Sequence, residues 1–235
     1  PELIFGNLLT STNYDKDEKR TIGGQNGIGA KACNILSEWF ELTTVDAGRK
    51  LMYTQMFRNN MKEVSKPSIK KCANKPFTKI RFLPDYGRFG GNTTDAKKKN
   101  EINPSTLESK DVLSTDMYSI LMKRAYDLCA LTPADVNVFV NDVKPNCKTF
   151  EKYVDMFLGP KDQKWRHYEA INDRWEIVVA CTDSPGFDHV SYVNGIWTMK
   201  GGKHVEYIAN QVSNKLAEVI KKRKKITDVK ASHIK

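Results

Sequence analysis

A glycine-rich stretch at residues 23–31 places the strongest constraint on how this chain folds and what it can bind. It reads Gly-Gly-Gln-Asn-Gly-Ile-Gly-Ala-Lys. Apolar residues then recur at three- and four-residue intervals, at Ala32, Ile35, Leu36 and Phe40. This spacing predicts a helix directly after the glycines. Glycine lets the backbone approach a ligand closely, and the first amides of a helix have no internal partners. The stretch therefore predicts an anion site, with Lys31 adding a positive charge.

Several known motifs compete for the same stretch. A P-loop needs Gly directly before its Lys, but Ala30 stands there and no buried strand precedes it, so this motif is excluded. Residues 27–32 fit the dinucleotide pattern G-x-G-x-x-A, which must follow a hydrophobic strand. Residues 15–20 are instead a run of charged side chains, which disfavours that interpretation. Two others stay open on spacing alone: a lid that folds over a nucleoside triphosphate, and a glycine-rich turn without a ligand.

The composition is that of a basic globular protein. The chain has a formal net charge of +10 and 40% hydrophobic residues, so either a polyanionic partner or plain solubility explains the charge. Its longest apolar runs are too short for a membrane span, and no secretory signal is visible. The five cysteines lack the spacing of a zinc or redox motif, which favours reduced thiols in an intracellular protein. No initiator Met is present, so we expect a piece of a longer protein.

The periodicity predicts an α+β fold in two units joined near residue 147. Helices are expected over residues 3–9, 32–40, 109–131 and 150–158, and through 205–219. Strands are expected over residues 41–44, 50–57, 77–82, 136–140, 175–181 and 189–193. Residues 90–107 are polar and aperiodic, which indicates a mobile surface loop.

Several separated blocks then narrow the choice. Residues 3–15 read Leu-Ile-Phe-Gly-Asn-Leu-Leu-Thr-Ser-Thr-Asn-Tyr-Asp, ahead of the glycine-rich stretch. Further blocks lie at residues 124–127, 153–156, 172–176, 193–195 and 200–205. Together they resemble the ATP-lid and following regions of eukaryotic-type type IIA DNA topoisomerases, members of the GHKL ATPase superfamily. The resemblance runs in order through nearly the whole chain; only residues 90–107 and 158–168 look unlike the family.

The resemblance implies roles for individual residues. Ser11, Thr12 and Asn13 would contact the ribose and phosphate region of ATP. The triphosphate would be wrapped mainly by backbone amides of the loop, comprising Gly24, Gln25, Asn26, Gly27, Ile28, Gly29, Ala30 and Lys31. Lys31 would lie near the outer phosphates. The family usually has Arg and an aromatic residue where this chain has Gln25 and Ile28; a missing Arg would weaken side-chain contacts, whereas the backbone cradle needs neither side chain.

The resemblance also implies a domain organisation and a second binding site. Residues 1–147 would be the C-terminal part of a GHKL (Bergerat) ATPase domain, and residues 148–235 the start of a ribosomal-S5-like transducer. A basic run closes the last predicted helix, and Lys221, Lys222 and Arg223 within it match a family DNA-contacting cluster. Cations at a helix C-terminus also favour the helix dipole, so a solvated helix end is the competing interpretation.

The implied activity is ATP-dependent passage of double-stranded DNA by a homodimer in the nucleus, or at a viral replication site in the host cytoplasm. No membrane partner is expected. By the resemblance, the water-activating Glu and the Asn that holds Mg²⁺ would precede Pro1, and the γ-phosphate lysine would follow Lys235. The DNA-cleaving Tyr would lie in a later domain, so no catalytic or metal-binding residue is expected here and the chain alone is expected not to hydrolyse ATP. The alternatives are a non-catalytic basic nucleic-acid-binding module with an idle glycine loop, and a Rossmann dehydrogenase with a strand before Gly24.

Overall fold

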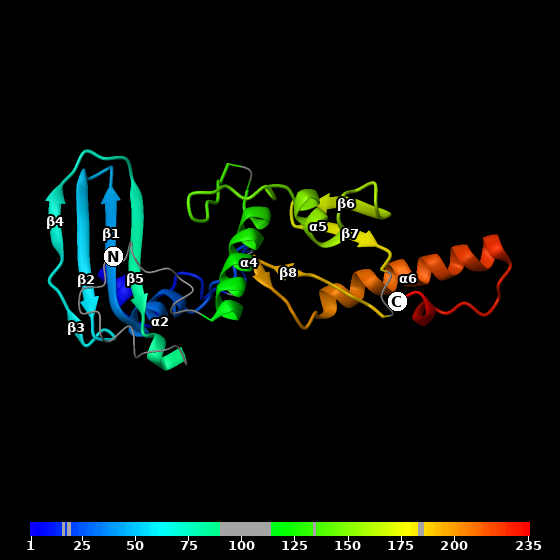
Figure 1. The fold of residues 1–235 in the computed structure, drawn as a ribbon, viewed down its shortest axis with the longest axis horizontal. Helices are drawn as coiled ribbons and strands as arrows, with labels where there is room; N and C mark the ends of the chain where they lie inside the picture. Colours follow the sequence, from blue (N-terminus) through cyan, green and yellow to red (C-terminus); the bar gives the residue numbers. More distant parts are fainter. Residues whose placement is uncertain (16, 18–19, 90–113, 134, 183–185) are drawn as a thin grey trace. The chain divides into compact units, whose positions relative to one another are not determined.

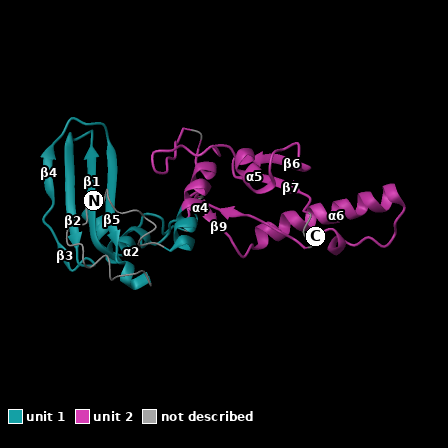
Figure 2. Ribbon diagram, viewed as in Figure 1, with its two compact units in different colours: residues 1–19, 24–121 teal, residues 20–23, 122–235 magenta. Residues whose placement is uncertain are grey.

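The computed structural model describes residues 1–15, 17, 20–89, 114–133, 135–182 and 186–235. The chain divides into two compact units: unit 1 is Pro1–Lys19 with Gly24–Leu121, and unit 2 is Arg20–Gly23 with Met122–Lys235 (Figure 2). The predicted loop at 90–107 and the first predicted helical residues at 109–113 lie outside the described residues. The expected domain boundary at residue 147 stays a prediction.

Unit 1 is built on a five-stranded antiparallel sheet (Figure 1). Its strand order is β3-β2-β1-β5, and β4 also pairs with β2. The strands are β1 (Ser37–Asp46), β2 (Leu51–Arg58), β3 (Glu63–Val64), β4 (Ser68–Lys71) and β5 (Phe77–Pro84). The other elements are α1 (Glu2–Gly6), α2 (Gly29–Ile35) and the 3₁₀ turn η1 (Tyr86–Phe89).

The core of unit 1 lies on one face of this sheet. Phe40 pairs in register with Phe57 on β2 and Phe82 on β5, so the three rings point to the same side. Phe40 and Phe57 are buried together with Leu42, and Phe5 of α1 packs against them. The side chains of Cys33 on α2 and of Tyr53 and Met61 pack there as well. This packing fixes α2, and hence the end of the glycine-rich stretch, on the sheet.

Unit 2 contains helices and two-stranded antiparallel hairpins. Its elements include α4 (Thr115–Leu131), along which the two units divide, and α5 (Phe150–Leu158). They continue with β6 (Arg166–Asn172), β7 (Trp175–Ala180), β8 (Tyr192–Val193), β9 (Ile196–Trp197), α6 (Lys203–Lys224) and the 3₁₀ turn η3 (Ala231–His233). Its core is formed by Cys129, Cys147 and Tyr153.

The β8–β9 hairpin follows from a two-residue turn. Val193 pairs with Ile196, and the residues between them, Asn194 and Gly195, have φ values of 50° and 74°. Asn-Gly is the preferred sequence for such a turn because both positions tolerate positive φ. The β6–β7 hairpin is held differently, since the backbone N–H of Arg174 donates to Oδ1 of Asn172 at 2.9 Å.

The α+β class and most predicted elements are confirmed. The structure has helices within the predicted ranges 150–158 and 205–219 and strands within 41–44, 50–57, 77–82 and 175–181. β3, β4, β6 and β9 had no counterpart among the predicted strands.

Four predicted elements need correction. The helix at 3–9 ends at Gly6. Phe40 lies in β1 because α2 ends at Ile35, and the aromatic and β-branched run that follows favours a strand. Residues 136–140 form no strand: Asn141 and Asp142, at φ 48° and 63°, turn the chain back so that only Val140 and Val143 pair. The strand at 189–193 shrinks to Tyr192–Val193.

Candidate nucleotide loop and cation cluster

The glycine-rich loop turns sharply at Gly27. Its φ is +60°, and a Cβ at this position would lie 2.9 Å from the carbonyl oxygen of Thr10 and 3.2 Å from the backbone nitrogen of Ser11. Only glycine combines this φ with so close an approach at low cost. Gly27 thus seats the middle of the loop directly on the chain that enters the 11–13 segment.

Hydrogen bonds tie the same two stretches together. The side chain of Asn13 donates from Nδ2 to the carbonyl oxygen of Gly24 at 2.9 Å. Its backbone N–H donates to Oγ of Ser11 at 3.1 Å, which closes a small turn around Thr12. The structure therefore brings together the predicted site residues 11–13 and 24–31. The bonded residues, Asn13 and Gly24, lie 11 positions apart in the sequence. Spacing did not indicate this contact.

The start of α2 offers backbone donors. The first intrahelical bond runs from the N–H of Ala32 to the carbonyl of Ile28, and no side chain caps the helix. Among the described residues, the N–H groups of Gly29, Ala30 and Lys31 have no backbone acceptor in this turn. Residues 24–29 are exposed apart from the half-buried Gly27. The loop is open to solvent with its donors available, as an anion site requires.

Lys31 lies closer to the 11–13 segment than spacing suggested. It is only 2% exposed, and its Nζ donates to Oγ1 of Thr10 at 2.6 Å. An ammonium has three donor hydrogens, so this bond leaves two for other acceptors. The side chain is held with its charge beside the loop rather than extended into solvent. Its predicted place near the outer phosphates stays a prediction.

The cation cluster forms the last turn of α6. Lys221, Lys222, Arg223 and Lys224 occupy that turn, and Lys225 ends the helix in a left-handed conformation with φ 54°. All five are exposed. Among the described side chains, none of the five has an ion-pair partner. The cluster is therefore an exposed concentration of positive charge, as predicted, at the C-terminal end of the long helix α6.

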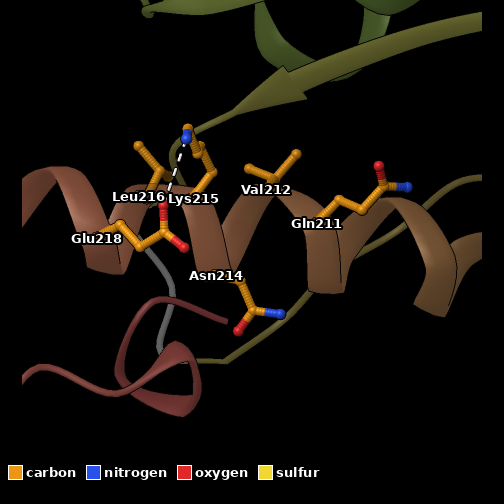
Figure 3. A pocket seen from close by; sticks show the side chains of 6 residues that line it. All are labelled: Gln211, Val212, Asn214, Lys215, Leu216 and Glu218. Carbon is orange, nitrogen blue, oxygen red and sulfur yellow. Dashed lines mark hydrogen bonds and ion pairs between the residues drawn. The ribbon is translucent and has the colours of Figure 1, made fainter.

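A surface pocket also lies along α6 (Figure 3). Its lining side chains are Gln211, Val212, Asn214, Lys215, Leu216 and Glu218. All belong to the same helix, and its two charged groups, Lys215 and Glu218, pair with each other at 3.3 Å. Because every lining residue that the structure describes comes from this one helix, we interpret the pocket as an open helix surface.

A buried polar cluster, which the sequence did not reveal, joins α4, α5 and the β8–β9 hairpin. Lys123 Nζ donates to the Asp127 carboxylate at 3.0 and 2.9 Å and to the Tyr192 hydroxyl at 3.1 Å. The Tyr153 hydroxyl donates to Asp127 and lies 2.6 Å from the Tyr192 hydroxyl. The ammonium also lies 4.1 Å from the ring centroid of Trp197. Asp127 and Tyr153 are 2% and 3% exposed, so the cluster belongs to the core of unit 2.

The same environment shifts several pKa values. Burial raises the pKa of Tyr153 far above its usual range, and the hydrogen bond to the Asp127 carboxylate raises it further. Burial lowers the pKa of Lys123, but its hydrogen bonds to Asp127 and Tyr192 outweigh this, so its net pKa is raised. Burial, with the adjacent Cys129 thiol, raises the pKa of Cys147 to about 12. These groups stay protonated near neutral pH, which fits a structural role. All five cysteines are free thiols in the structure.

The described residues show neither a metal-binding cluster nor a membrane-spanning helix. Within them, no three His, Cys, Asp or Glu side chains are grouped so that they could hold a metal ion. Within the same residues, no helix has the length and apolarity needed to cross a bilayer.

Comparisons with known proteins agree along the chain. The family model for DNA gyrase B matches residues 136–235. DNA topoisomerase 2 of Candida albicans is 40% identical over 96% of this chain. The crystal structure of the ATPase region of Saccharomyces cerevisiae topoisomerase II is 38% identical, with a TM-score of 0.79 over 98% of this chain. The chain belongs to the type II DNA topoisomerase family.

The match also locates the chain within that family. It spans 15% of the Candida albicans topoisomerase and 55% of the solved yeast ATPase region. A second solved structure, of the ATPase and transducer domains of topoisomerase II from Balamuthia mandrillaris, has a TM-score of 0.80 at 33% identity. The match covers 98% of this chain and 54% of the Balamuthia mandrillaris chain. The chain thus corresponds to part of a topoisomerase II ATPase region.

Proposed function

We propose that this chain forms part of an ATP-driven type II DNA topoisomerase, and that its residues 24–31 close over the triphosphate of ATP. The supporting observation is the exposed loop whose centre, Gly27, is seated on Thr10 and which leads into the uncapped start of α2. Backbone donors there favour an anion, and Lys31 adds a fixed positive charge beside it. Ser11, Thr12 and Asn13 border the same loop and would contact the ribose and phosphates.

ATP is the nucleotide proposed, and this chain's part is to bind and orient it. Phosphoryl transfer needs little covalent help from protein; it needs the charges on the phosphates held and neutralised. The loop amides and Lys31 supply that here. We assign no step to Mg²⁺ and propose that its ligands come from elsewhere in the protein. A nuclear location and a homodimeric assembly are likewise proposals.

The test of this proposal is binding of a non-hydrolysable ATP analogue to the intact protein. Lys31→Met keeps the buried stem but removes the charge, so affinity should fall about tenfold to a hundredfold, as expected for one lost charge-assisted contact. Isothermal titration measures it. Lys75→Ala removes one exposed charge from the turn between β4 and β5 and serves as the charge-matched control. An unchanged affinity in Lys31→Met would exclude the proposed role of the loop.

We further propose that the cation cluster of α6 contacts the phosphates of double-stranded DNA. Exposed side chains without ion-pair partners in the described structure can neutralise phosphates without first breaking a protein contact. Such contacts carry no base readout, so binding should be independent of sequence. The cluster also suits the C-terminal end of the helix dipole, and this effect alone explains it if DNA binding does not depend on it.

Neutralising Lys221, Lys222 and Arg223 together to alanine should weaken DNA binding and its dependence on salt. Each lost phosphate contact lowers the slope of log affinity against log salt by about 0.9, so the triple variant should lose up to about 3 units. Fluorescence anisotropy with a labelled duplex at several salt concentrations measures it. The triple variant of Lys70, Lys75 and Lys79 removes the same charge from exposed positions in unit 1 and should keep the slope. Equal slopes in both variants would favour the solvated-helix-end interpretation.

The same experiments separate the proposal from its alternative. A non-catalytic basic module would lose DNA binding in the cluster variant but would not respond to the nucleotide analogue or to Lys31→Met. A dehydrogenase would require a strand ahead of the glycines. Among the described residues between α1 and Gly24 the structure has none.

A further inference from the structure

The segment directly ahead of Gly24 is fixed by contacts within unit 2. Residues Arg20–Gly23 group with unit 2, whereas the chain from Gly24 onward belongs to unit 1. The four residues directly ahead of Gly24 therefore take their contacts from unit 2. Two separate contacts anchor this segment.

The first contact is steric. A Cβ on Gly23 would lie 2.1 Å from Cδ1 and 2.5 Å from Cγ1 of Ile196, and 3.3 Å from the carbonyl oxygen of Asn194. The backbone of Gly23 thus lies flush against the β8–β9 hairpin, at a distance that no side chain allows. The φ of Gly23 is not in the left-handed region. The glycine is therefore needed for the close approach and not for its backbone conformation.

The second contact is a hydrogen bond. NH2 of Arg174, in the β6–β7 turn, donates to the carbonyl oxygen of Arg20 at 2.9 Å. This carbonyl belongs to the peptide bond between Arg20 and Thr21. The bond and the Ile196 contact hold the two ends of a four-residue segment.

The hairpin that supports Gly23 is itself fixed. NH1 of Arg124 on α4 donates to the carbonyl of Gly195 at 2.7 Å. The neighbouring residue on α4, Lys123, donates to the Tyr192 hydroxyl on β8 and lies over the ring of Trp197 on β9. These contacts attach the hairpin, and with it the surface that receives Gly23, to α4.

We propose that Ile196 and Arg174 are positioning residues for the glycine-rich loop: by fixing residues 20–23 they restrict the loop to conformations close to the one that binds a polyphosphate. A loop fixed at its start loses less conformational freedom when its amides close on an anion, so it binds the anion more tightly. The role rests on the nucleotide site proposed above.

The test is a compensating pair of substitutions in the intact protein. Gly23→Ala places a methyl group into Ile196 and should detach the segment. Ile196→Ala removes the two carbon atoms in conflict, so Gly23→Ala combined with Ile196→Ala should re-seat it. Arg174→Ala removes the second contact separately. Binding of a non-hydrolysable ATP analogue should weaken about threefold to tenfold in Gly23→Ala and in Arg174→Ala, and should recover in the double variant.

A second readout reports on the anchor without nucleotide. Trypsin cleaves after Arg20 by attacking the carbonyl that Arg174 binds. Cleavage at this bond, located by mass spectrometry, should rise about tenfold in Gly23→Ala and in Arg174→Ala and return toward wild type in the double variant. Cleavage at the exposed α6 cation cluster is the internal control and should not change. Additive effects without recovery in the double variant would overturn the proposed contact.

The two readouts keep this inference apart from the proposed function. If the double variant restores protection from trypsin but no variant alters analogue affinity, the anchor exists and its role in nucleotide binding is overturned. If the wild-type protein does not bind the analogue, the proposed nucleotide site fails, and the trypsin result still decides whether Ile196 and Arg174 hold the segment. Recovery in both readouts supports the whole inference.

Discussion

Replacing Asp127 by alanine is expected to cost about 3 kcal/mol of unfolding free energy, the largest effect on stability among the substitutions considered. The carboxylate is 2% exposed and accepts hydrogen bonds from Lys123 and Tyr153. Its removal leaves an ammonium and a hydroxyl without their acceptor inside the protein. Breaking a buried pair by removing one partner costs about 3–5 kcal/mol, and the lower end applies because Lys123 retains 33% exposure of its side chain. Urea denaturation followed by tryptophan fluorescence measures it.

A double substitution shows whether the uncompensated charge causes this loss. Lys123→Met with Asp127→Leu removes both charges and fills the space, and such replacements are often neutral or stabilising. The Tyr153 and Tyr192 hydroxyls still have each other at 2.6 Å. The double variant should therefore recover much of the loss. A cost below about 1 kcal/mol in Asp127→Ala would contradict the role given to this cluster.

The pKa shifts give the cluster a defined pH dependence. The pKa values of both Tyr153 and Lys123 are raised in the folded state. A raised pKa means that the folded protein holds the proton more tightly, so the stabilisation is complete below the unfolded values of about 10. It is lost as pH rises through the folded values. As pH rises above about 10, the unfolding free energy of Asp127→Ala should therefore fall less than that of the wild-type protein.

The fold was predictable where local pattern decides it. The helix α5, the long helix α6, the strands β2 and β5 and the middle of β1 follow from apolar spacing and β-branched content. The failure at residues 136–140 shows where this stops: the run has strand composition, but a strand also needs a partner. The turn at Asn141 and Asp142 folds the chain back at once, so a single pair forms.

The candidate site residues could be named from the sequence, but their arrangement could not. Sequence blocks containing Asp127 and Tyr153 carried the family resemblance, yet nothing in their spacing says that these two side chains meet in one core. Long-range contacts of this kind depend on tertiary packing. A local signal was available for the β8–β9 hairpin, since Asn194-Gly195 between two apolar residues predicts a tight turn. Even with the hairpin predicted, its contact with Gly23 could not be inferred from the sequence.

Gly27→Ala is expected to have the largest effect on nucleotide binding of any single methyl group added to the loop. The residue has φ +60°, and the new Cβ would lie 2.9 Å from the Thr10 carbonyl oxygen. Left-handed backbone costs a side-chain-bearing residue about 1–2 kcal/mol, and the conflict with Thr10 is with backbone that cannot rotate away. The loop must leave its seat on the 11–13 segment, so affinity for a non-hydrolysable ATP analogue should fall by at least about tenfold.

Gly29→Ala is the matched control, because it adds the same methyl group to the same loop. Its Cβ would meet nothing within 4 Å, its φ is not left-handed, and it lies in the first turn of α2. Alanine favours helix over glycine by about 1 kcal/mol, so stability should be unchanged or slightly higher and the backbone amide is retained. Thermal unfolding and analogue titration of both variants separate the two positions. If Gly29→Ala weakened binding as much as Gly27→Ala, the methyl group itself would obstruct the nucleotide; if neither did, the loop would not be where the phosphates bind.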